Sequence, residues 1–487
     1  MQMRASEIAA CTGGTVVVGD DSMANMLVWD SRKVSPGCLY VAFPGERVDG
    51  HRFVVSSIEA GATVALISQE PDEEMCAAAK TCGAALVRVE NTPEAVTALA
   101  RAWREKLHGR VIGLTGSVGK TTTKNLVRDV LAAQFKTVAT EKNQNNELGV
   151  PNTVLRADID TEVVVVEMGM RGAGQLESLC AFVKPDWGIV TNVGDCHIEL
   201  LGSRDNIARA KAELICALPD GTGMAFLNAG DAYCDFIKDV ARLSERGIVA
   251  VRYDGTYEAA GRGWDVDDGA PAVWATDIEL DALSQPRFTL NVRGFGGESE
   301  GSRTCRLALR GLHNVSNACA AAAVGCAMGM SLECVCAALA DAQPEVGRQE
   351  VFTATRGFTV VNDAYNANPD SMKASLSMFS SMAVEGRRIA VLGDMGELGD
   401  FAAEGHRQVG ALAASLPIDV LVCVGPLSAD VASAAIEAGM DPESVVRVKH
   451  ADEALEVVTT MVESPDAVLV KASHYMGLDR VAEGLVR

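Results

Sequence analysis

Short runs of consecutive apolar residues recur along this chain, and longer stretches with apolar residues at helical spacing lie between them. Uninterrupted apolar runs are typical of strands that are buried on both faces of a parallel sheet. Strands are therefore expected at residues 39–43, 63–67, 86–89, 163–167, 188–191, 358–362, 389–392, 420–424 and 468–470. Their alternation with helical segments predicts an α/β protein with doubly wound sheets.

Two stretches depart from this pattern. Residues 251–310 are rich in Gly, Asp and Thr with alternating apolar positions, which predicts antiparallel strands at the side of the preceding sheet. The Ala-rich stretch 315–341 predicts one helix that closes this block. Because Asn317, Ser331 and Glu333 interrupt it, a buried helix explains it better than a membrane span.

A chain of 487 residues is too long for a single core. We predict a small α/β N-terminal domain at 1–105 and a central domain at 106–345, whose mostly parallel sheet carries helices on both faces. A doubly wound, Rossmann-like C-terminal domain is predicted at 346–487.

Amino-acid composition argues against several classes of function and location. The chain has 43 basic and 65 acidic residues and a formal charge of −22, which argues against a broad nucleic-acid-binding surface. No secretory segment is expected at the start, because Arg4, Ser6 and Glu7 interrupt it. The 14 scattered cysteines fit reduced thiols, so we expect a cytoplasmic protein that does not span a membrane.

The most informative segment runs from Gly113 to Asn125 and combines a strand, a glycine-rich loop and the start of a helix. Such a loop directs backbone N–H groups at an anion, and the helix dipole favours negative charge there. Lys120 can reach the β- and γ-phosphates of a nucleotide, and the Thr121 hydroxyl can coordinate Mg²⁺. The predicted ATP-binding loop consists of Thr115, Gly116, Ser117, Val118, Gly119, Lys120, Thr121 and Thr122.

This loop matches the standard P-loop pattern incompletely. Leu114 stands where that pattern has glycine, and the chain has Gly116 instead. A chance Gly-Lys-Thr in a turn between strand and helix is the alternative. The strand before the loop and the helix after it favour phosphate binding.

Three further polar residues belong to the same block. Glu167 ends a buried strand, where a carboxylate is costly unless it is paired or bound to a metal, so either a Mg²⁺ ligand or a salt-bridged glutamate explains it. His197 lies in a loop after the next strand and is a candidate for metal or phosphate contact, although a lone histidine is usually structural. For Lys211, spacing alone favours a solvent-exposed helix face.

Residues 362–372 of the third block are dense in turn-forming polar residues after a strand. Turn chemistry alone explains the Asn-Pro pair. The repeated asparagines, together with Asp363 and Tyr365, favour a ligand-binding loop.

In their order along the chain, several segments resemble the Mur ligase family. Residues 30–34 and 45–51 resemble its uridine-nucleotide domain, and residues 115–122 resemble its ATP loop, which accounts for the displaced glycine. The segments most typical of the branch that adds D-alanyl-D-alanine are 143–151, 363–372 and 392–399 with His406. The matching segments span nearly the whole chain.

The resemblance implies an ATP-dependent amide ligase of peptidoglycan precursor synthesis. Family members phosphorylate the terminal carboxylate of a UDP-linked muramoyl peptide, and an amine then attacks the acyl phosphate through a tetrahedral intermediate. For this chain it implies ATP and Mg²⁺ as cofactors, and UDP-N-acetylmuramoyl-tripeptide and D-alanyl-D-alanine as substrates. We expect a monomer whose domains close on ATP and substrate.

Carried over residue by residue, the resemblance assigns Lys120, His197 and Lys211 to catalysis. The implied Mg²⁺ ligands are Thr121, Glu167, His197 and Lys211, the last as a carbamate, because an unmodified lysine is a cation. Further implied nucleotide contacts are Asn228, Asp231, Asn314, Asn317, Arg348 and Asp363. The implied UDP-substrate contacts are Ser31, Arg32, Asp49, His51, Asn143, Asn145 and Asn146, and those near the amine are Tyr365, Asn366 and Asn368.

The chain departs from the family pattern in the third block. Asn362 stands where many relatives have a second acidic residue, so a contact centred on Asp363 is the safer expectation. Residues 471–474 read Lys-Ala-Ser-His in place of Lys-Gly-Ser-Arg. Because His474 lacks the permanently charged fork of arginine, an anion contact there is not carried over.

Two other functions stay open. A different Mur ligase or a folylpolyglutamate synthase-like ligase would use another amine acceptor, and the segment at 30–32 argues against the folate version. A P-loop nucleotide switch would bind partners without ligation, but it leaves the N-terminal block and the third-block motifs unexplained.

Overall fold

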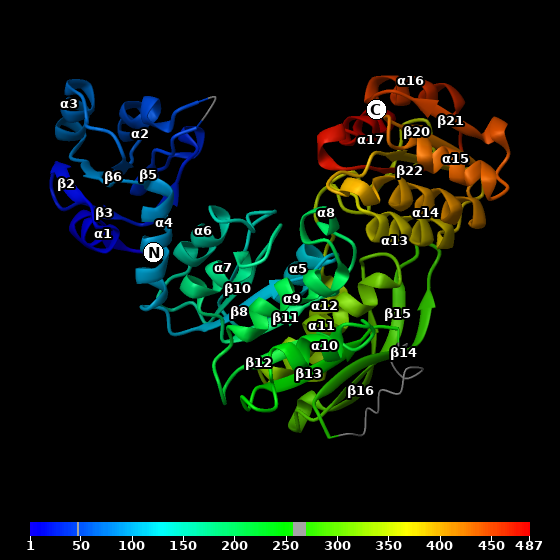
Figure 1. Ribbon diagram of the computed structural model, residues 1–487, viewed down its shortest axis with the longest axis horizontal. Helices are drawn as coiled ribbons and strands as arrows, with labels where there is room; N and C mark the ends of the chain where they lie inside the picture. Colours follow the sequence, from blue (N-terminus) through cyan, green and yellow to red (C-terminus); the bar gives the residue numbers. More distant parts are fainter. Residues whose placement is uncertain (46–47, 257–268) are drawn as a thin grey trace.

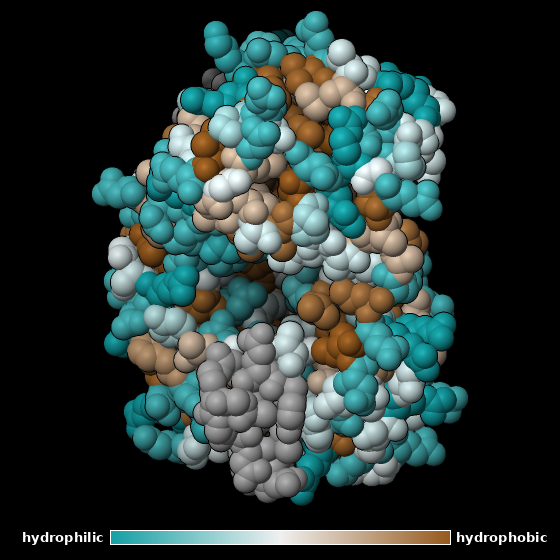
Figure 2. Space-filling model, turned by 90° about the vertical axis from the view of Figure 1, so that its right-hand side faces the viewer, coloured by the Kyte–Doolittle hydropathy of each residue, from teal (hydrophilic) through white to brown (hydrophobic). Residues whose placement is uncertain are grey.

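A computed structural model describes residues 1–45, 48–256 and 269–487. Its large sheets lie in three successive blocks, with the N-terminal and C-terminal blocks on opposite sides of the central one (Figure 1). Seen from the side of the C-terminal block, the surface mixes hydrophilic and hydrophobic residues, and a hollow opens at mid-height (Figure 2). Among the described residues, no helix is both long and apolar enough to cross a membrane.

The N-terminal block contains a five-stranded sheet of order β2-β7-β6-β5-β4, in which β4 to β7 are parallel and β2 is antiparallel. A separate antiparallel pair joins β1 (Met3–Arg4) and β3 (Met23–Ala24). The other strands are β2 (Thr15–Val18), β4 (Met26–Val28), β5 (Cys38–Val41), β6 (Val64–Ile67) and β7 (Ala85–Arg88). The helices are α1 (Ala5–Thr12), α2 (Val54–Glu59), α3 (Glu73–Cys82) and α4 (Thr92–Arg104).

The central block contains a nine-stranded sheet of order β16-β15-β14-β13-β12-β11-β8-β10-β9. Neighbouring strands from β9 to β14 are parallel, and β14, β15 and β16 pair antiparallel. The strands are β8 (Arg110–Thr115), β9 (Thr137–Ala139), β10 (Val163–Glu167), β11 (Trp187–Val190), β12 (Met224–Asn228), β13 (Val249–Asp254), β14 (Ala272–Leu280), β15 (Pro286–Arg293) and β16 (Gly301–Arg306). The pairing of β14, β15 and β16 confirms the predicted antiparallel strands at the side of this sheet, whereas 251–254 belong to the parallel strand β13. Residues 257–268 of that stretch lie outside the described residues.

Helices cover both faces of the central sheet. Val164 and Val166 pack into one apolar cluster, and their neighbours Val163 and Val165 pack into another on the opposite face. The first cluster includes α6 (Gly149–Arg156), α7 (Gln175–Val183), α9 (Arg204–Cys216) and α10 (Cys234–Val240). The second includes α5 (Lys120–Ala132), α11 (His313–Ala327) and α12 (Leu332–Asp341).

The expectation of one helix over 315–341 was wrong, because α11 and α12 are separate helices. Gly329 adopts a left-handed φ of 81°, which ends the first helix. The Ser331 side chain then accepts a 3.2 Å hydrogen bond from the Cys334 N–H and caps the second helix.

The C-terminal block is a six-stranded sheet of order β17-β18-β22-β19-β20-β21, parallel except for the edge strand β17. Its strands are β17 (Glu350–Thr353), β18 (Thr359–Asn362), β19 (Arg388–Gly393), β20 (Val420–Val424), β21 (Val445–Val448) and β22 (Ala467–Lys471). Its helices are α13 (Pro369–Ser381), α14 (Ala402–Ser415), α15 (Ala429–Glu437), α16 (Ala451–Met461) and α17 (Asp479–Val486). Apolar clusters on both faces confirm the predicted doubly wound arrangement.

The apolar clusters differ in extent. The cluster on the α6 and α7 face of the central sheet continues into the N-terminal block, where Trp103 of α4 donates its indole N–H to the Ala157 carbonyl at 2.8 Å. The two clusters of the C-terminal block contain only residues of that block. The N-terminal and central blocks therefore share one core.

Candidate functional site

A cavity of about 1060 Å³ lies between the central and C-terminal blocks. Its lining comes from the loops after β8, β10 and β11 on one side and from the loops after β18, β19 and β22 on the other. These are the carboxyl ends of parallel strands, where open α/β sheets bind ligands.

The predicted ATP loop lines this cavity from Ser117 to Thr122. Gly119 begins α5 with a left-handed φ of 79°, which glycine adopts without steric cost. The Lys120 ammonium donates to the carbonyls of Gly116 at 2.8 Å and Ser117 at 3.2 Å. The lysine is therefore already placed over the loop that would cradle phosphates.

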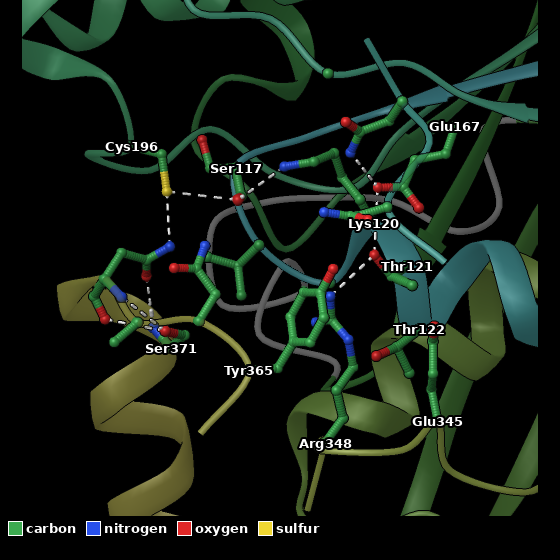
Figure 3. A pocket seen from close by; sticks show the side chains of 18 of the residues that line it. Ser117, Lys120, Thr121, Thr122, Glu167, Cys196, Glu345, Arg348, Tyr365 and Ser371 are labelled. Carbon is green, nitrogen blue, oxygen red and sulfur yellow. Dashed lines mark hydrogen bonds between the residues drawn. The ribbon is translucent and has the colours of Figure 1, made fainter. Parts of the chain in front are cut away.

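Glu167 lies fully buried at the end of β10, beside the ATP loop (Figure 3). Its Oε1 accepts hydrogen bonds from the Thr121 hydroxyl at 3.2 Å and from the Asn145 amide at 2.8 Å. Its Oε2 is buried and has no hydrogen-bond partner within the described ranges. A buried carboxylate oxygen without a partner is costly, and a cation would satisfy it.

The donor set at Glu167 suits Mg²⁺ that is shared with a nucleotide. The described residues contain no group of three or more His, Cys, Asp or Glu side chains that could hold a metal ion. Mg²⁺ usually takes one or two protein carboxylates and completes its octahedron with water and substrate phosphates. A hydroxyl and a carboxylate beside a phosphate-binding loop therefore fit such a cation.

Arg348 reaches the ATP loop from the segment that joins the two blocks (Figure 3). Its Nη2 donates to the Thr121 hydroxyl at 3.2 Å, and its guanidinium carbon lies 4.4 Å from the centre of the Tyr365 ring. Its Nε is buried without a partner among the described residues. The predicted Arg348 and Tyr365 thus lie together at the mouth of the loop.

Asp363 is buried and already bonded to the protein. It accepts hydrogen bonds from the Lys471 ammonium at 2.7 Å, from the Gln349 N–H at 3.2 Å and from the Ser375 hydroxyl. Lys471 also donates to the Asn366 carbonyl at 3.0 Å. These hydrogen bonds hold the loop after β18 in place through the Asp363 carboxylate. Lys471 was not predicted as the partner of Asp363.

The predicted asparagines divide between the cavity wall and structural roles. Asn314 and Asn317 line the cavity, joined by a 2.8 Å hydrogen bond. Asn368 caps α13 by accepting from the Ser371 N–H at 2.8 Å, and its amide contacts the Cys196 sulfur at 2.7 Å. Asn143, Asn145, Asn146 and Asn366 also line the cavity.

Asn228 and Asp231 do not line the cavity. The Asn228 amide donates to the Thr191 carbonyl at 2.9 Å, and Asp231 accepts from the Val193 N–H at 2.7 Å. Through these hydrogen bonds, both residues stabilise the loop after β11, which contains His197.

His197 stands at the cavity wall with a left-handed φ of 63°. Burial, reinforced by the charge of Lys120, lowers the pKa of its imidazole to about 4. The ring is therefore neutral at pH 7, as a metal ligand must be. Glu397, which was not predicted, places a carboxylate oxygen 3.2 Å from its Nδ1.

Lys211 is only 1% exposed, which excludes the solvent-exposed helix face that spacing alone favoured. Lys211 does not line the cavity. Burial, reinforced by the positive charge of Lys120, lowers the pKa of its ammonium to about 7. A substantial fraction is therefore a neutral, nucleophilic amine near neutral pH.

The predicted uridine-side residues of the N-terminal block lie away from this cavity. Arg32 is exposed and pairs with Asp30 at 2.9 Å. His51 is buried, with Nδ1 2.6 Å from Asp49 Oδ1 and Nε2 accepting from the Ser68 N–H at 2.9 Å. Both ring nitrogens are thus engaged, and His51 positions Asp49. Glu46 and Arg47 of this segment lie outside the described residues.

Comparisons with known proteins agree with this arrangement. Family models described as the Mur ligase middle domain, the Mur ligase glutamate ligase domain and the Mur ligase family catalytic domain match residues 114–325, 347–474 and 24–104. The UDP-N-acetylmuramoyl-tripeptide–D-alanyl-D-alanine ligase of Mycobacterium tuberculosis is 37% identical over 100% of this chain and 98% of its own length. The Bacillus subtilis ligase of that name is 32% identical over 94% and 92%. A crystal structure of MurF from Acinetobacter baumannii superimposes with a TM-score of 0.82 at 30% identity, covering 100% of this chain and 99% of that one.

Proposed function

Because this chain belongs to the Mur ligase family, we propose that it is an ATP-dependent ligase that joins D-alanyl-D-alanine to UDP-N-acetylmuramoyl-tripeptide. The single observation that carries the proposal is the unpartnered, buried Oε2 of Glu167 beside Thr121 in the ATP loop. A cation bound at this oxygen would neutralise the buried carboxylate and could also coordinate the phosphates of a nucleotide, which supports the use of ATP with Mg²⁺.

In the proposed reaction, ATP phosphorylates the terminal carboxylate of the muramoyl peptide, and ADP leaves. The amine of the dipeptide then attacks the acyl phosphate, and phosphate leaves as the amide forms. The transition states concentrate negative charge, so catalysis depends on positioning and neutralisation. Lys120 supplies a cation to the phosphates when it swings off the loop carbonyls, and Arg348 supplies a second at the mouth of the loop.

Thr121 and Glu167 would hold Mg²⁺, which supplies charge neutralisation on the phosphates when it is bound. His197 and Lys211 are proposed for a second cation. The lowered pKa of Lys211 supports its proposed carbamoylation, because a neutral amine is the form that reacts with carbon dioxide. The carbamate would convert a buried cation into a carboxylate-like ligand.

We assign the UDP moiety to Ser31, Arg32 and Asp49 of the N-terminal block, with His51 as the positioning group of Asp49. Asn143, Asn145 and Asn146 are assigned to the peptide of the UDP-linked substrate. Tyr365, Asn366 and Asn368, which also line the cavity, are assigned to the amine. Asn314 and Asn317 are assigned to the adenine side.

The same proposal includes the domain boundaries 1–105, 106–345 and 346–487. Each large sheet falls inside one of these ranges, which supports them. We also propose a cytoplasmic enzyme, because all 14 cysteines are free thiols, as is usual in a reducing compartment. That the enzyme is a monomer stays a prediction.

The test is phosphate release from ATP with UDP-N-acetylmuramoyl-tripeptide, with and without D-alanyl-D-alanine, and the product mass. We expect release that requires both substrates and a product that gains the dipeptide. Lys120→Met should abolish release, whereas the surface variant Lys136→Met should leave it unchanged. Release with a single amino acid would assign a different amine acceptor, and turnover indifferent to both substrates would refute the ligase.

A further inference from the structure

Lys124 is a buried cation that the proposed reaction does not use. Its side chain is 1% exposed, and it does not line the cavity. It follows Lys120 by one helical turn in α5, so both lysines lie on the same face of that helix. Lys120 donates to carbonyls of the ATP loop, whereas the Lys124 ammonium donates to the Thr140 carbonyl at 2.7 Å. A buried ammonium is costly, so a neutral side chain would fill this place at less cost.

Thr140 connects Lys124 to Glu167. It comes directly after β9, and its N–H donates to the Val165 carbonyl of β10 at 3.0 Å. Its hydroxyl accepts the Glu167 N–H at 3.0 Å. The ladder between β9 and β10 ends with the pair of Ala139 and Val165. Beyond that pair, on this side of β10, the side chain of Thr140 holds the main chain of Glu167.

The position of Glu167 matters because of its second carboxylate oxygen. Oε1 accepts from the Thr121 hydroxyl and the Asn145 amide, whereas Oε2 is buried without a hydrogen-bond partner in residues 1–45, 48–256 and 269–487 (Figure 3). The Lys124 ammonium acts on this carboxylate with opposite charge. The lysine therefore lowers the electrostatic cost of burying Glu167 and leaves Oε2 to a cation.

We propose that Lys124 is a positioning residue for the cation site at Glu167. Through Thr140 it fixes the main chain of Glu167, so that the carboxylate stands beside the Thr121 hydroxyl before a metal ion arrives. Groups that orient a metal ligand from behind contribute strongly, and their loss typically lowers metal affinity roughly 10- to 100-fold. Lys124 has this role only if Glu167 binds Mg²⁺ as proposed, whichever amine the enzyme uses.

The first test measures metal affinity without turnover. Mn²⁺, which suits the same oxygen ligands as Mg²⁺ and is visible by electron paramagnetic resonance, is titrated into the enzyme saturated with ADP. Lys124→Met should raise the Mn²⁺ concentration for half-saturation about tenfold and change the metal-free ADP affinity by less than about twofold. Thr140→Val, which removes the hydroxyl that accepts from Glu167, should weaken Mn²⁺ binding similarly. Thr140→Ser, which keeps a hydroxyl, should restore most of the affinity.

A second measurement separates positioning from fold stability. Thr92→Val is the matched control, because Thr92 is also buried and its hydroxyl donates to the Ala42 carbonyl at 3.0 Å in the N-terminal block. It should lower the melting temperature and leave the Mn²⁺ affinity unchanged. The double variant of Lys124→Met and Thr140→Val should lose little more Mn²⁺ affinity than the weaker-binding single variant, because both changes act through Glu167.

Several results would overturn the proposal. One is unchanged Mn²⁺ affinity in Lys124→Met, and another is losses that add in the double variant. If Lys124→Met does not fold, equal Mn²⁺ affinity in Thr140→Val and Thr140→Ser would overturn it instead. A wild type that does not bind Mn²⁺ with ADP would refute both the cation site and the role of Lys124. A wild type that binds Mn²⁺ with ADP but lacks ligase activity would refute only the proposed function.

Discussion

Removing the Lys471 ammonium should loosen the loop after β18. Lys471 and Asp363 form an ion pair at 2.7 Å, and their side chains are only 4% and 11% exposed. In Lys471→Met, the carboxylate would lose its cation while it remains buried. The Asn366 carbonyl would lose its 3.0 Å donor as well.

The expected magnitude follows from the contacts that remain. Breaking a buried ion pair by removing one partner costs about 3–5 kcal/mol. Asp363 keeps the Gln349 N–H and the Ser375 hydroxyl as donors, which places the loss at the lower end, about 3 kcal/mol. Asp363→Asn should cost about as much, because it strands the ammonium. The double variant should cost about 2 kcal/mol less than the sum.

Hydrogen exchange followed by mass spectrometry suits this prediction. All five tryptophans lie in the first 274 residues, so their fluorescence would not report on the C-terminal block. A loss of about 3 kcal/mol should accelerate exchange in peptides of β18 and β22 about 100-fold, because 1.36 kcal/mol corresponds to a factor of ten. Peptides of β8 should not change.

Two results would refute this reasoning. One is exchange in β18 and β22 that rises less than threefold in Lys471→Met. The other is strict additivity in the double variant, which would mean that the pair carries no coupling energy.

Three further predictions concern the ATP loop and its surroundings. Glu167→Gln should raise the Mg²⁺ concentration for half-maximal phosphate release at least tenfold, since the neutral amide binds Mg²⁺ poorly, and an unchanged titration would exclude Glu167 as a ligand. Gly119→Ala, whose Cβ would lie 2.8 Å from the Asn317 oxygen, should weaken ATP binding about tenfold by calorimetry; Gly174→Ala has the same φ of 79° in open space and should not. In buffer free of carbon dioxide, Lys211→Met should raise the melting temperature at pH 7. The pKa of Lys211 is about 7 in the folded state, below its ordinary value of 10.5, so the unfolded state binds more protons between these two pH values. Wild-type stability therefore rises with pH in this range, and the advantage of Lys211→Met should shrink by about pH 10. An advantage that grew with pH would contradict the burial of this lysine.

Most of the buried strands were predictable from their continuous apolar runs, although the interior strand β12 was missed. Residues 163–167 and 420–424 match β10 and β20, since a run of Val that is buried on both faces suits only an interior parallel strand. The edge strands β2, β9, β17 and β21 are short and only partly buried, and they were not predicted. The division of α11 from α12 depended on one glycine and one serine inside an apolar stretch.

Site residues that lie together in one short segment of the sequence were predictable. The loop from Ser117 to Thr122 lines the cavity as expected, because its spacing carries the geometry. Glu397 and Lys471 were missed, since each acts through a partner on a different strand or a different block. The burial of Lys211 depends on packing, which helical spacing alone does not specify.

The separate cores of the C-terminal block have a consequence for how the enzyme would release its product. Polar contacts join the two blocks across the cavity, among them Arg348 with Thr121 at 3.2 Å and Arg171 with Glu397 at 3.1 Å. The side chains of Arg171 and Glu397 are largely exposed. Parting them exposes little apolar surface, so opening should change the heat capacity only slightly. Added salt weakens exposed ion pairs. Ionic strength, more than temperature, should therefore set how often the cavity opens to solvent.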